Sequence, residues 1–205
     1  MSEEQLFLLD EKLRPCGSAP RSEAHRRGLL HLVVHCWICE HTPDGIWLYF
    51  QQRAHTKNDF PDYYDLAVAG HVSAGEEPLD AMCREIEEEA GLHIQKSDLI
   101  EIGSTLETIQ KGPFYDREYA QIYLLEKPAE PFAPGEEVAQ MVRVKLEECC
   151  RRELEGASAV TAYRMTGEAL TLAAEQWCSH PGELERVVLP ALKRYQFPIF
   201  KQRLL

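Results

Sequence analysis

The sequence lacks the features that direct a chain into a membrane or out of the cell. No run of about 18 uncharged apolar residues occurs, so we expect no membrane-spanning helix. The stretch from Met1 to Asp10 has no basic region followed by an apolar one, which argues against a signal peptide. The seven cysteines are odd in number and show no spacing typical of a disulfide framework. We therefore expect reduced thiols and a cytoplasmic protein.

Positive charge is also scarce. The chain has 34 acidic and 22 basic residues, which gives a net charge of -12 at pH 7. This balance argues against nonspecific binding to nucleic acid or to anionic membrane, because both attract basic proteins. A phosphate-bearing small molecule remains compatible with it, provided that bound cations reverse the local charge. The run from Glu85 to Glu89 is the first indication of where those cations bind.

What the sequence does contain is a mixture of strand and helix patterns over 205 residues, enough for one domain with an appendage. Apolar and β-branched runs predict strands at 29–39, 46–52, 66–69, 100–109, 118–125 and 139–144. Apolar spacing predicts helices at 78–90, 146–154, 167–178 and 182–195. We expect an α/β layered fold with a mixed sheet. It divides into an N-terminal extension that forms a hairpin (1–28), a central domain (29–150) and a helical C-terminal extension (151–205).

The predicted helix at 78–90 carries the residues most suggestive of chemistry. Pro78 suits its first turn, and Gly91 suits the position after its end. At about 100° per residue, its apolar side chains fall on one arc that faces the core: Leu79, Met82, Cys83, Ile86 and Ala90. Glu85, Glu88 and Glu89 fall on an adjoining arc, near the negative end of the helix dipole. A divalent cation would relieve their repulsion, although this pattern alone is more often a solvated acidic face.

The spacing around the helix decides between these two interpretations. Residues 70–92 read GHVSAGEEPLDAMCREIEEEAGL, which resembles the Nudix box, G-x5-E-x7-R-E-U-x-E-E-x-G-U, where U is apolar. All specified positions match: Gly70, Glu76, Arg84, Glu85, Ile86, Glu88, Glu89, Gly91 and Leu92. A chance match is on the order of one in a billion per starting position. The chain therefore resembles the Nudix hydrolases.

This resemblance implies a fold and a set of roles. The fold is an α/β/α sandwich with a mixed sheet, in which residues 29–150 would form the Nudix hydrolase domain. Glu85, Glu88 and Glu89 would be ligands of Mg²⁺ or Mn²⁺, and the last two would also be catalytic. Arg84 would act in catalysis by orienting a glutamate through a bidentate pair. Glu76 would be a structural carboxylate.

The implied reaction is metal-dependent hydrolysis of a diphosphate linkage in a nucleoside diphosphate derivative or a similar small molecule. Metal ions would withdraw charge from the diphosphate and lower the pKa of the attacking water, while a carboxylate served as general base. The base lies either in the box or downstream of it. Glu118, also a candidate metal ligand, and Asp116 are the main downstream candidates. Glu136 and Glu137 are weaker ones, because a proline-containing acidic loop is usually solvated.

A second resemblance lies outside the box. The stretches RSEAHRRGLLHLVVH and LYFQQRAHTK, and the AGH at the start of the box, look like the Nudix branch that includes type I isopentenyl diphosphate isomerases. In that branch, histidines like His25, His31 and His71 build a separate metal site with an acidic pair like Asp116 and Glu118. The resemblance therefore implies a second metal site in this chain.

The isomerase activity itself is disfavoured. Those isomerases use a cysteine just before the Gly-His of the box, where this chain has Leu66, Ala67, Val68 and Ala69. Proton transfer at carbon is hard to arrange without that group, so a hydrolase is the preferred interpretation. A noncatalytic nucleotide-binding regulatory module is a third hypothesis. The complete set of box glutamates and the absence of a basic recognition helix argue against it.

Two further groups of residues are expected to be structural or are left open. Five histidines have no partners at ligand spacing and are expected to be surface or satisfied core residues: His35, His41, His55, His93 and His180. Apolar residues of the C-terminal extension either contact a second copy in a homodimer or pack against their own domain: Leu170, Leu172, Trp177, Leu184, Val188 and Leu192.

Overall fold

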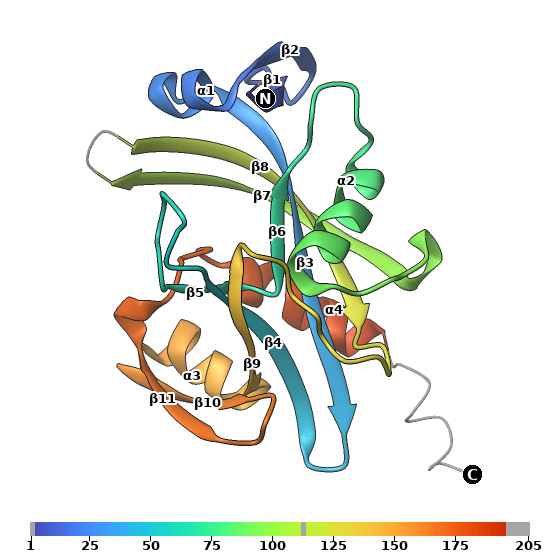
Figure 1. The fold of residues 1–205 in the computed structure, drawn as a ribbon, viewed down its shortest axis with the longest axis vertical. Coiled ribbons are helices and arrows are strands. Elements are labelled where there is room, and N and C mark those ends of the chain that lie inside the picture. The colour runs from blue at the N-terminus through green and yellow to red at the C-terminus, as the bar shows by residue number, and fades with distance from the viewer. Residues whose placement is uncertain (1–2, 112–113, 196–205) are drawn as a thin grey trace.

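The computed structural model describes residues 3–111 and 114–195 and contains one large mixed sheet with helices on both faces (Figure 1). Its strands are β1 (Gln5–Leu9), β2 (Pro15–Pro20), β3 (Leu30–Thr42), β4 (Gly45–Arg53), β5 (Tyr64–Leu66), β6 (Val68–His71), β7 (Leu99–Lys111), β8 (Phe114–Glu126), β9 (Val138–Lys145), β10 (Ala159–Arg164) and β11 (Ala169–Ala173). Its helices are α1 (Arg21–Arg27), α2 (Pro78–Glu85), α3 (Leu146–Glu155) and α4 (Leu189–Arg194). Single turns are η1 (Ile86–Ala90), η2 (Lys96–Asp98), η3 (Ala174–Gln176) and η4 (Leu184–Val188).

Strand β3 is the centre of the sheet. It pairs in parallel with β8 along ten residues, and antiparallel with β4, β6 and β1. Because side chains alternate along a strand, β3 contributes to both faces. Leu32 and Val34 pack in the core beneath α2, whereas Val33 and Trp37 pack in the core beneath α3, η4 and α4. The predicted α/β/α layering and mixed sheet are therefore confirmed.

The N-terminal extension forms the predicted hairpin. Strands β1 and β2 pair antiparallel, and α1 follows directly (Figure 1). Helix α1 ends at Gly28, whose φ of 60° is a left-handed conformation that glycine adopts without strain. This turn leads the chain into β3 and leaves α1 beside β8. The extension thus brings His25 of α1 near the ends of the central strands.

The helix predicted at 78–90 is present, with one irregularity. It is α-helical through Glu85 and continues as the π-helical turn η1 to Ala90. Its apolar side chains Met82, Ile86 and Ala90 are fully buried, as the periodicity predicted. Gly91 then ends the helix at a φ of 63°. A π-helical turn widens the backbone and is frequent at functional sites.

The prediction of an all-helical C-terminal extension is wrong in its middle part. The helices predicted at 146–154 and 182–195 are present, but residues 167–178 form β11 and the short turn η3. The apolar residues Leu170 and Leu172 are two apart, which is the period of a strand. Strand β11 pairs with β10, which pairs with β9, so the sheet continues past residue 150. Residues 196–205 of the predicted extension lie outside the described residues.

The apolar residues of this extension pack into their own chain. All but one are at most 8% exposed, and the remaining one packs against the same core: Leu172, Trp177, Leu184, Val188, Leu192 and Leu170. Of the two predicted alternatives for these residues, the structure shows packing against their own domain. All seven cysteines are free. Within residues 3–111 and 114–195, no helix is long and apolar enough to cross a membrane.

Candidate active site

One large cavity collects most of the residues that the sequence singled out. Its volume of about 1010 Å³ is ample for a nucleotide-sized molecule. Its wall carries the box carboxylates, the downstream acidic pair and two of the predicted histidines: Glu85, Glu88, Glu89, Asp116, Glu118, His25 and His71. Basic side chains and the segment 177–181 complete the wall: Arg21, Arg53 and Lys57. Two other cavities are only about 10 Å³ each and could not hold a substrate.

Arg84 of α2 holds the box together. Its Nε and Nη2 donate to the two carboxylate oxygens of Glu76 at 3.0 and 3.1 Å, a bidentate pair of the kind that the resemblance implies. Its Nη1 donates to Glu85 Oε1 at 2.7 Å and to Glu88 Oε2 at 3.2 Å. Its Nη2 also reaches the carbonyl oxygen of His71 at 3.1 Å. The guanidinium thus fixes the helix against the strand that precedes it.

Gly70 makes room for the Glu85 side chain. A Cβ built on Gly70 would lie 2.1 Å from Glu85 Cδ and 2.3 Å from Oε1, far inside contact distance. The carboxylate can lie against the backbone of β6 only because residue 70 has no side chain. Glycine at the start of the box is therefore required by close approach.

Glu89 is the most buried of the three box carboxylates. Its Oε2 accepts hydrogen bonds from Gln51 Nε2 at 2.9 Å and from the backbone NH of Ala69 at 3.0 Å. Burial, followed by the charge of Glu85, raises the pKa of Glu89 to about 8. Burial also raises the pKa of Glu85 to about 7, against the opposing effect of Arg84. A divalent cation bound beside these two carboxylates would lower both pKa values and favour the ionised forms.

The three box glutamates share the cavity, but they do not form a compact set of donors. Among the described residues, the tight groups of metal-binding side chains all lie elsewhere, around histidines. The physical reason is Arg84, whose Nη1 lies between Glu85 and Glu88 and takes the role of a cation for both. Glu88 is also 58% exposed, so its side chain has room to move toward a ligand.

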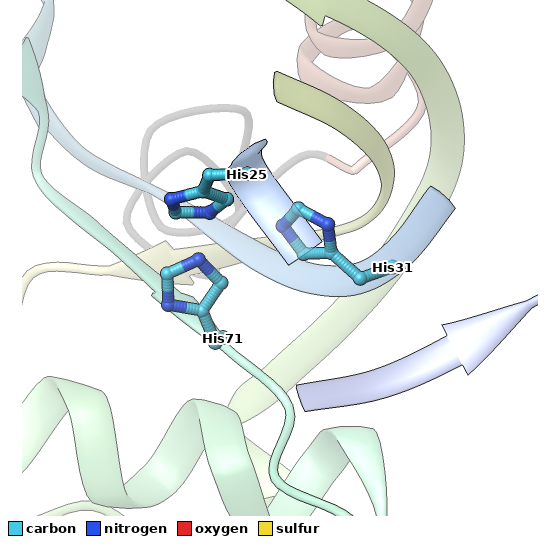
Figure 2. A group of neighbouring side chains, drawn as sticks. All are labelled: His25, His31 and His71. Carbon is cyan, nitrogen blue, oxygen red and sulfur yellow. The ribbon is translucent and has the colours of Figure 1, made fainter. Parts of the chain in front are cut away.

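The histidines predicted for a second site do converge. Figure 2 shows His25 of α1, His31 of β3 and His71 of β6 with their rings facing one another. Their ring centroids lie 5.3–5.5 Å apart, and one nitrogen from each lies within 4.8 Å of the others. Asp116 Oδ1 lies 3.4 Å from His31 Nε2, and Glu118 Oε1 lies 4.0 Å from the same nitrogen. All five predicted residues are therefore neighbours.

The donor atoms of this histidine cluster fit a metal ion. His31 Nε2 and Asp116 Oδ1 are buried, yet neither makes a hydrogen bond within the described part of the chain. Buried polar atoms without partners are rare, and an ion is one common explanation. Burial lowers the pKa of His71 well below its usual value, which favours the neutral imidazole that a metal requires. Burial and Asp116 raise the pKa of Glu118 well above the ordinary value.

Within residues 3–111 and 114–195, the structure groups Glu118 with the histidines and Asp116 rather than with the box glutamates. The histidine cluster and the box meet at the end of β6. There His71 follows Gly70, and the carbonyl oxygen of His71 accepts a hydrogen bond from Arg84. Of the weaker candidates, Glu136 and Glu137 both line the cavity, and Glu137 Oε2 pairs with Lys57 Nζ at 2.5 Å.

One further cluster of histidines and carboxylates was not predicted from the sequence. His35 and His180, expected to be isolated, lie together with Glu107 and Glu183, with one donor atom of each within 4.8 Å of the others. These residues come from β3, β7 and the segment around η4. Only the spacing of His180 and Glu183, three residues apart, is a local signal, and it is too short to identify a site.

Comparison with known proteins identifies the family of the chain. A family model described as the NUDIX domain matches residues 29–164. An uncharacterised Nudix hydrolase of Clostridium acetobutylicum is 34% identical over 154 residues, covering 74% of each chain. An isopentenyl-diphosphate Delta-isomerase of Kocuria rhizophila is 28% identical over 138 residues, covering 67% of this chain and 75% of that protein. The crystal structure of a MutT/nudix family protein from Enterococcus faecalis is similar in fold, with a TM-score of 0.50 and 20% identity, over 69% of this chain and 51% of that one.

A fold with helices on both faces of a mixed sheet, and a box helix facing a large cavity, define the class of protein. The chain belongs to the Nudix family. Its resemblance to Nudix hydrolases is confirmed, and relatives named as isopentenyl diphosphate isomerases match at lower identity.

Proposed function

We propose that this Nudix protein is a metal-dependent diphosphohydrolase that acts on a nucleoside diphosphate derivative or a similar small molecule. The observation that carries the proposal is the arrangement of Arg84, which joins Glu76, Glu85 and Glu88 at the wall of the 1010 Å³ cavity. A helix whose carboxylates were merely solvated would not need one arginine that contacts three of them.

Glu85, Glu88 and Glu89 would hold Mg²⁺ or Mn²⁺, because hard cations prefer carboxylate oxygens. Bound cations supply positive charge to the diphosphate and lower the pKa of the attacking water. The chain itself contributes the positions of these carboxylates. Gly70 lets Glu85 reach the backbone, and Gln51 orients Glu89.

The general base would be a box glutamate or Glu118. Glu118 lines the same cavity as the box glutamates, so its carboxylate could accept a proton from a water molecule there. Asp116 would orient the neighbouring histidines rather than contact substrate. Together with His25, His31 and His71, these two carboxylates would form the second metal site, whose imidazoles suit a transition metal.

The substrate would enter past basic and aromatic side chains. Arg53 and Lys57 lie on the wall, each already paired with a carboxylate, so their contribution to diphosphate binding is partly neutralised. Phe60 also lines the cavity. Its φ of 50° is a backbone conformation that is uncommon for residues other than glycine. A base or another flat group would stack there.

An isomerase of prenyl diphosphates is the second candidate. The histidine cluster and the isomerase-named relative favour it. The segment from Leu66 to Ala69 opposes it, since it offers no thiol in front of Gly70. A noncatalytic nucleotide-binding module is the third.

One panel experiment distinguishes these candidates. Phosphate and nucleotide release would be measured with Mg²⁺ or Mn²⁺ on nucleoside diphosphates and triphosphates, sugar nucleotides, dinucleotide diphosphates and coenzyme A. Isopentenyl diphosphate would be followed separately for isomerisation. We expect metal-dependent hydrolysis of one nucleotide class. Isomerisation without hydrolysis would overturn the proposal, as would tight binding of one compound without turnover of any.

A further inference from the structure

A second set of histidines and carboxylates lies apart from the cluster of Figure 2. His35 projects from the middle of β3, Glu107 from β7, and His180 and Glu183 from the C-terminal segment before η4. One nitrogen or oxygen from each of the four lies within 4.8 Å of the others. His31 of the first cluster is four residues before His35 on β3, which corresponds to about 13 Å along the strand. The two clusters are therefore separate sites.

The four residues contact each other in pairs within the group, and His180 and Glu183 are also held from outside it, by Asp65 and by Trp37. His180 Nδ1 lies 3.0 Å from Glu107 Oε2, and its Nε2 lies 2.9 Å from Asp65 Oδ1. Glu183 Oε2 lies 3.0 Å from His35 Nδ1, while its Oε1 accepts from Trp37 Nε1 at 2.6 Å. Metal ligands in proteins show this arrangement, in which a ligating histidine is paired on its far side with a carboxylate.

The balance of charge also points to a cation. Asp65, Glu107 and Glu183 are 6%, 6% and 0% exposed, and Arg53 pairs with Asp65 at 3.1 Å. Glu107 and Glu183 are left as buried carboxylates without a lysine or arginine partner among the described residues, and a divalent cation would neutralise both.

An unsatisfied oxygen supports the same conclusion. Glu107 is buried, and its Oε1 makes no hydrogen bond with any of the residues that the structure describes. A buried carboxylate oxygen without a donor is costly. Glu107 also lies opposite Glu118 in the β7–β8 ladder, which adds further negative charge to this end of the sheet.

We propose that His35, Glu107, His180 and Glu183 hold a divalent transition-metal ion such as Zn²⁺ or Mn²⁺. Two imidazoles and two carboxylates suit such an ion better than Mg²⁺, which prefers oxygen ligands only. Two of the ligands, His180 and Glu183, lie beyond residue 164, where the match to the family model ends. The ion would fasten the C-terminal segment to the central strand β3 and so fix the 177–181 wall of the cavity.

The direct test is anomalous diffraction from a crystal of the wild-type protein equilibrated with Zn²⁺ and, separately, with Mn²⁺. The proposal expects an anomalous peak enclosed by His35, Glu107, His180 and Glu183, at a position separate from any peak at the first histidine cluster. No peak there, with an ion at the first cluster, would show that the four residues form a metal-free ion-pair network and would overturn the proposal.

Metal content in solution gives a second readout. Chelated protein would be reloaded with Zn²⁺, dialysed and assayed by mass spectrometry. Glu183→Gln keeps the size of the side chain and should lose one equivalent of metal relative to wild type, together with the rise in thermal midpoint that Zn²⁺ gives. His93→Gln is the matched control, because His93 is exposed and belongs to none of these clusters. Equal metal content in Glu183→Gln and wild type would contradict the site. If Glu183→Gln fails to fold, the crystal experiment still decides.

Discussion

Gly70→Ala is the substitution that tests the construction of the box most specifically. The added Cβ would lie 2.1 Å from Glu85 Cδ, whereas carbon atoms in contact are about 3.5–4.0 Å apart. The carboxylate of Glu85 must therefore move by roughly 1.5 Å, away from its bond with Arg84 Nη1. Gly70 does not have a positive φ, so alanine adds little backbone strain there.

The expected magnitude follows from this displacement. A misplacement of about 1 Å in a catalytic arrangement costs roughly 100-fold in rate, so turnover should fall by at least about that factor. Leaving a buried carboxylate without its partner costs about 1–3 kcal/mol of folding stability, which leaves the chain folded. Mn²⁺ binding, followed by electron paramagnetic resonance on protein whose two histidine clusters are first loaded with Zn²⁺, should weaken in parallel and requires no knowledge of the substrate.

A double-mutant cycle separates the clash from other effects. In a Glu85→Ala background the three atoms that the new Cβ would meet are absent, so Gly70→Ala should then cost little further stability. Gly17→Ala is the control, since nothing lies within 4 Å of its Cβ. Its φ of 132° makes alanine strained there, but Mn²⁺ binding should remain unchanged. Wild-type Mn²⁺ affinity in Gly70→Ala would refute the reasoning.

Three other predictions concern the box helix. Arg84→Lys should reduce Mn²⁺ affinity by about 10–100-fold, because lysine cannot form the bidentate pair with Glu76. An unchanged Mn²⁺ titration would show that the pair is dispensable. Burial raises the pKa of Glu89 to about 8, so the metal-free folded chain holds more protons than the unfolded chain between about pH 4.5 and 8. The free energy of unfolding in chelator should therefore decrease as pH rises through this window, and urea titrations should show a shallower decrease in Glu89→Gln. Gly91→Ala should lower the free energy of unfolding, measured by urea denaturation, by about 2–5 kcal/mol. The φ of Gly91 is 63°, and an added Cβ would lie 1.9 Å from the carbonyl oxygen of Ala133. Near-wild-type stability would contradict this packing.

The parts of the fold that the sequence predicted well are those with a strong local period. Strands β3 and β4 follow from buried β-branched and aromatic runs, and helix α2 follows from its apolar arc and from Pro78 and Gly91 at its ends. The π-helical turn η1 was not predictable, because its five residues carry the same periodicity as a regular helix within one turn.

The error at residues 167–178 has a physical cause. The segment EALTLAAEQW is rich in residues with high helix propensity, which favoured a helix. Pairing with β10 and burial of Leu172 outweigh that propensity, and tertiary contacts commonly do so. The alternation of Leu170 and Leu172 was the better signal, but it spans too few residues to decide.

The candidate site was predictable to different extents. The box residues are close in sequence, so the resemblance to the Nudix box could be recognised from one short segment. His25, His31 and His71 required a resemblance, because their neighbourhood depends on α1 returning to the start of β3. His35 and His180 were missed, since 145 positions separate them and only the path of the C-terminal segment brings their rings to 4.9 Å.

The most direct test of the central claim compares two neighbouring glutamates on one helix. Hydrolysis of the panel substrate would be measured at saturating Mg²⁺ in Glu88→Gln and in Glu87→Gln. Glu87 occupies an unspecified box position, and its side chain is 64% exposed, so it is a matched control. The account predicts a loss of at least about 100-fold for Glu88→Gln, with unchanged folding, and near-wild-type turnover for Glu87→Gln. Equal turnover in both variants would contradict the assignment of the box glutamates as the metal ligands.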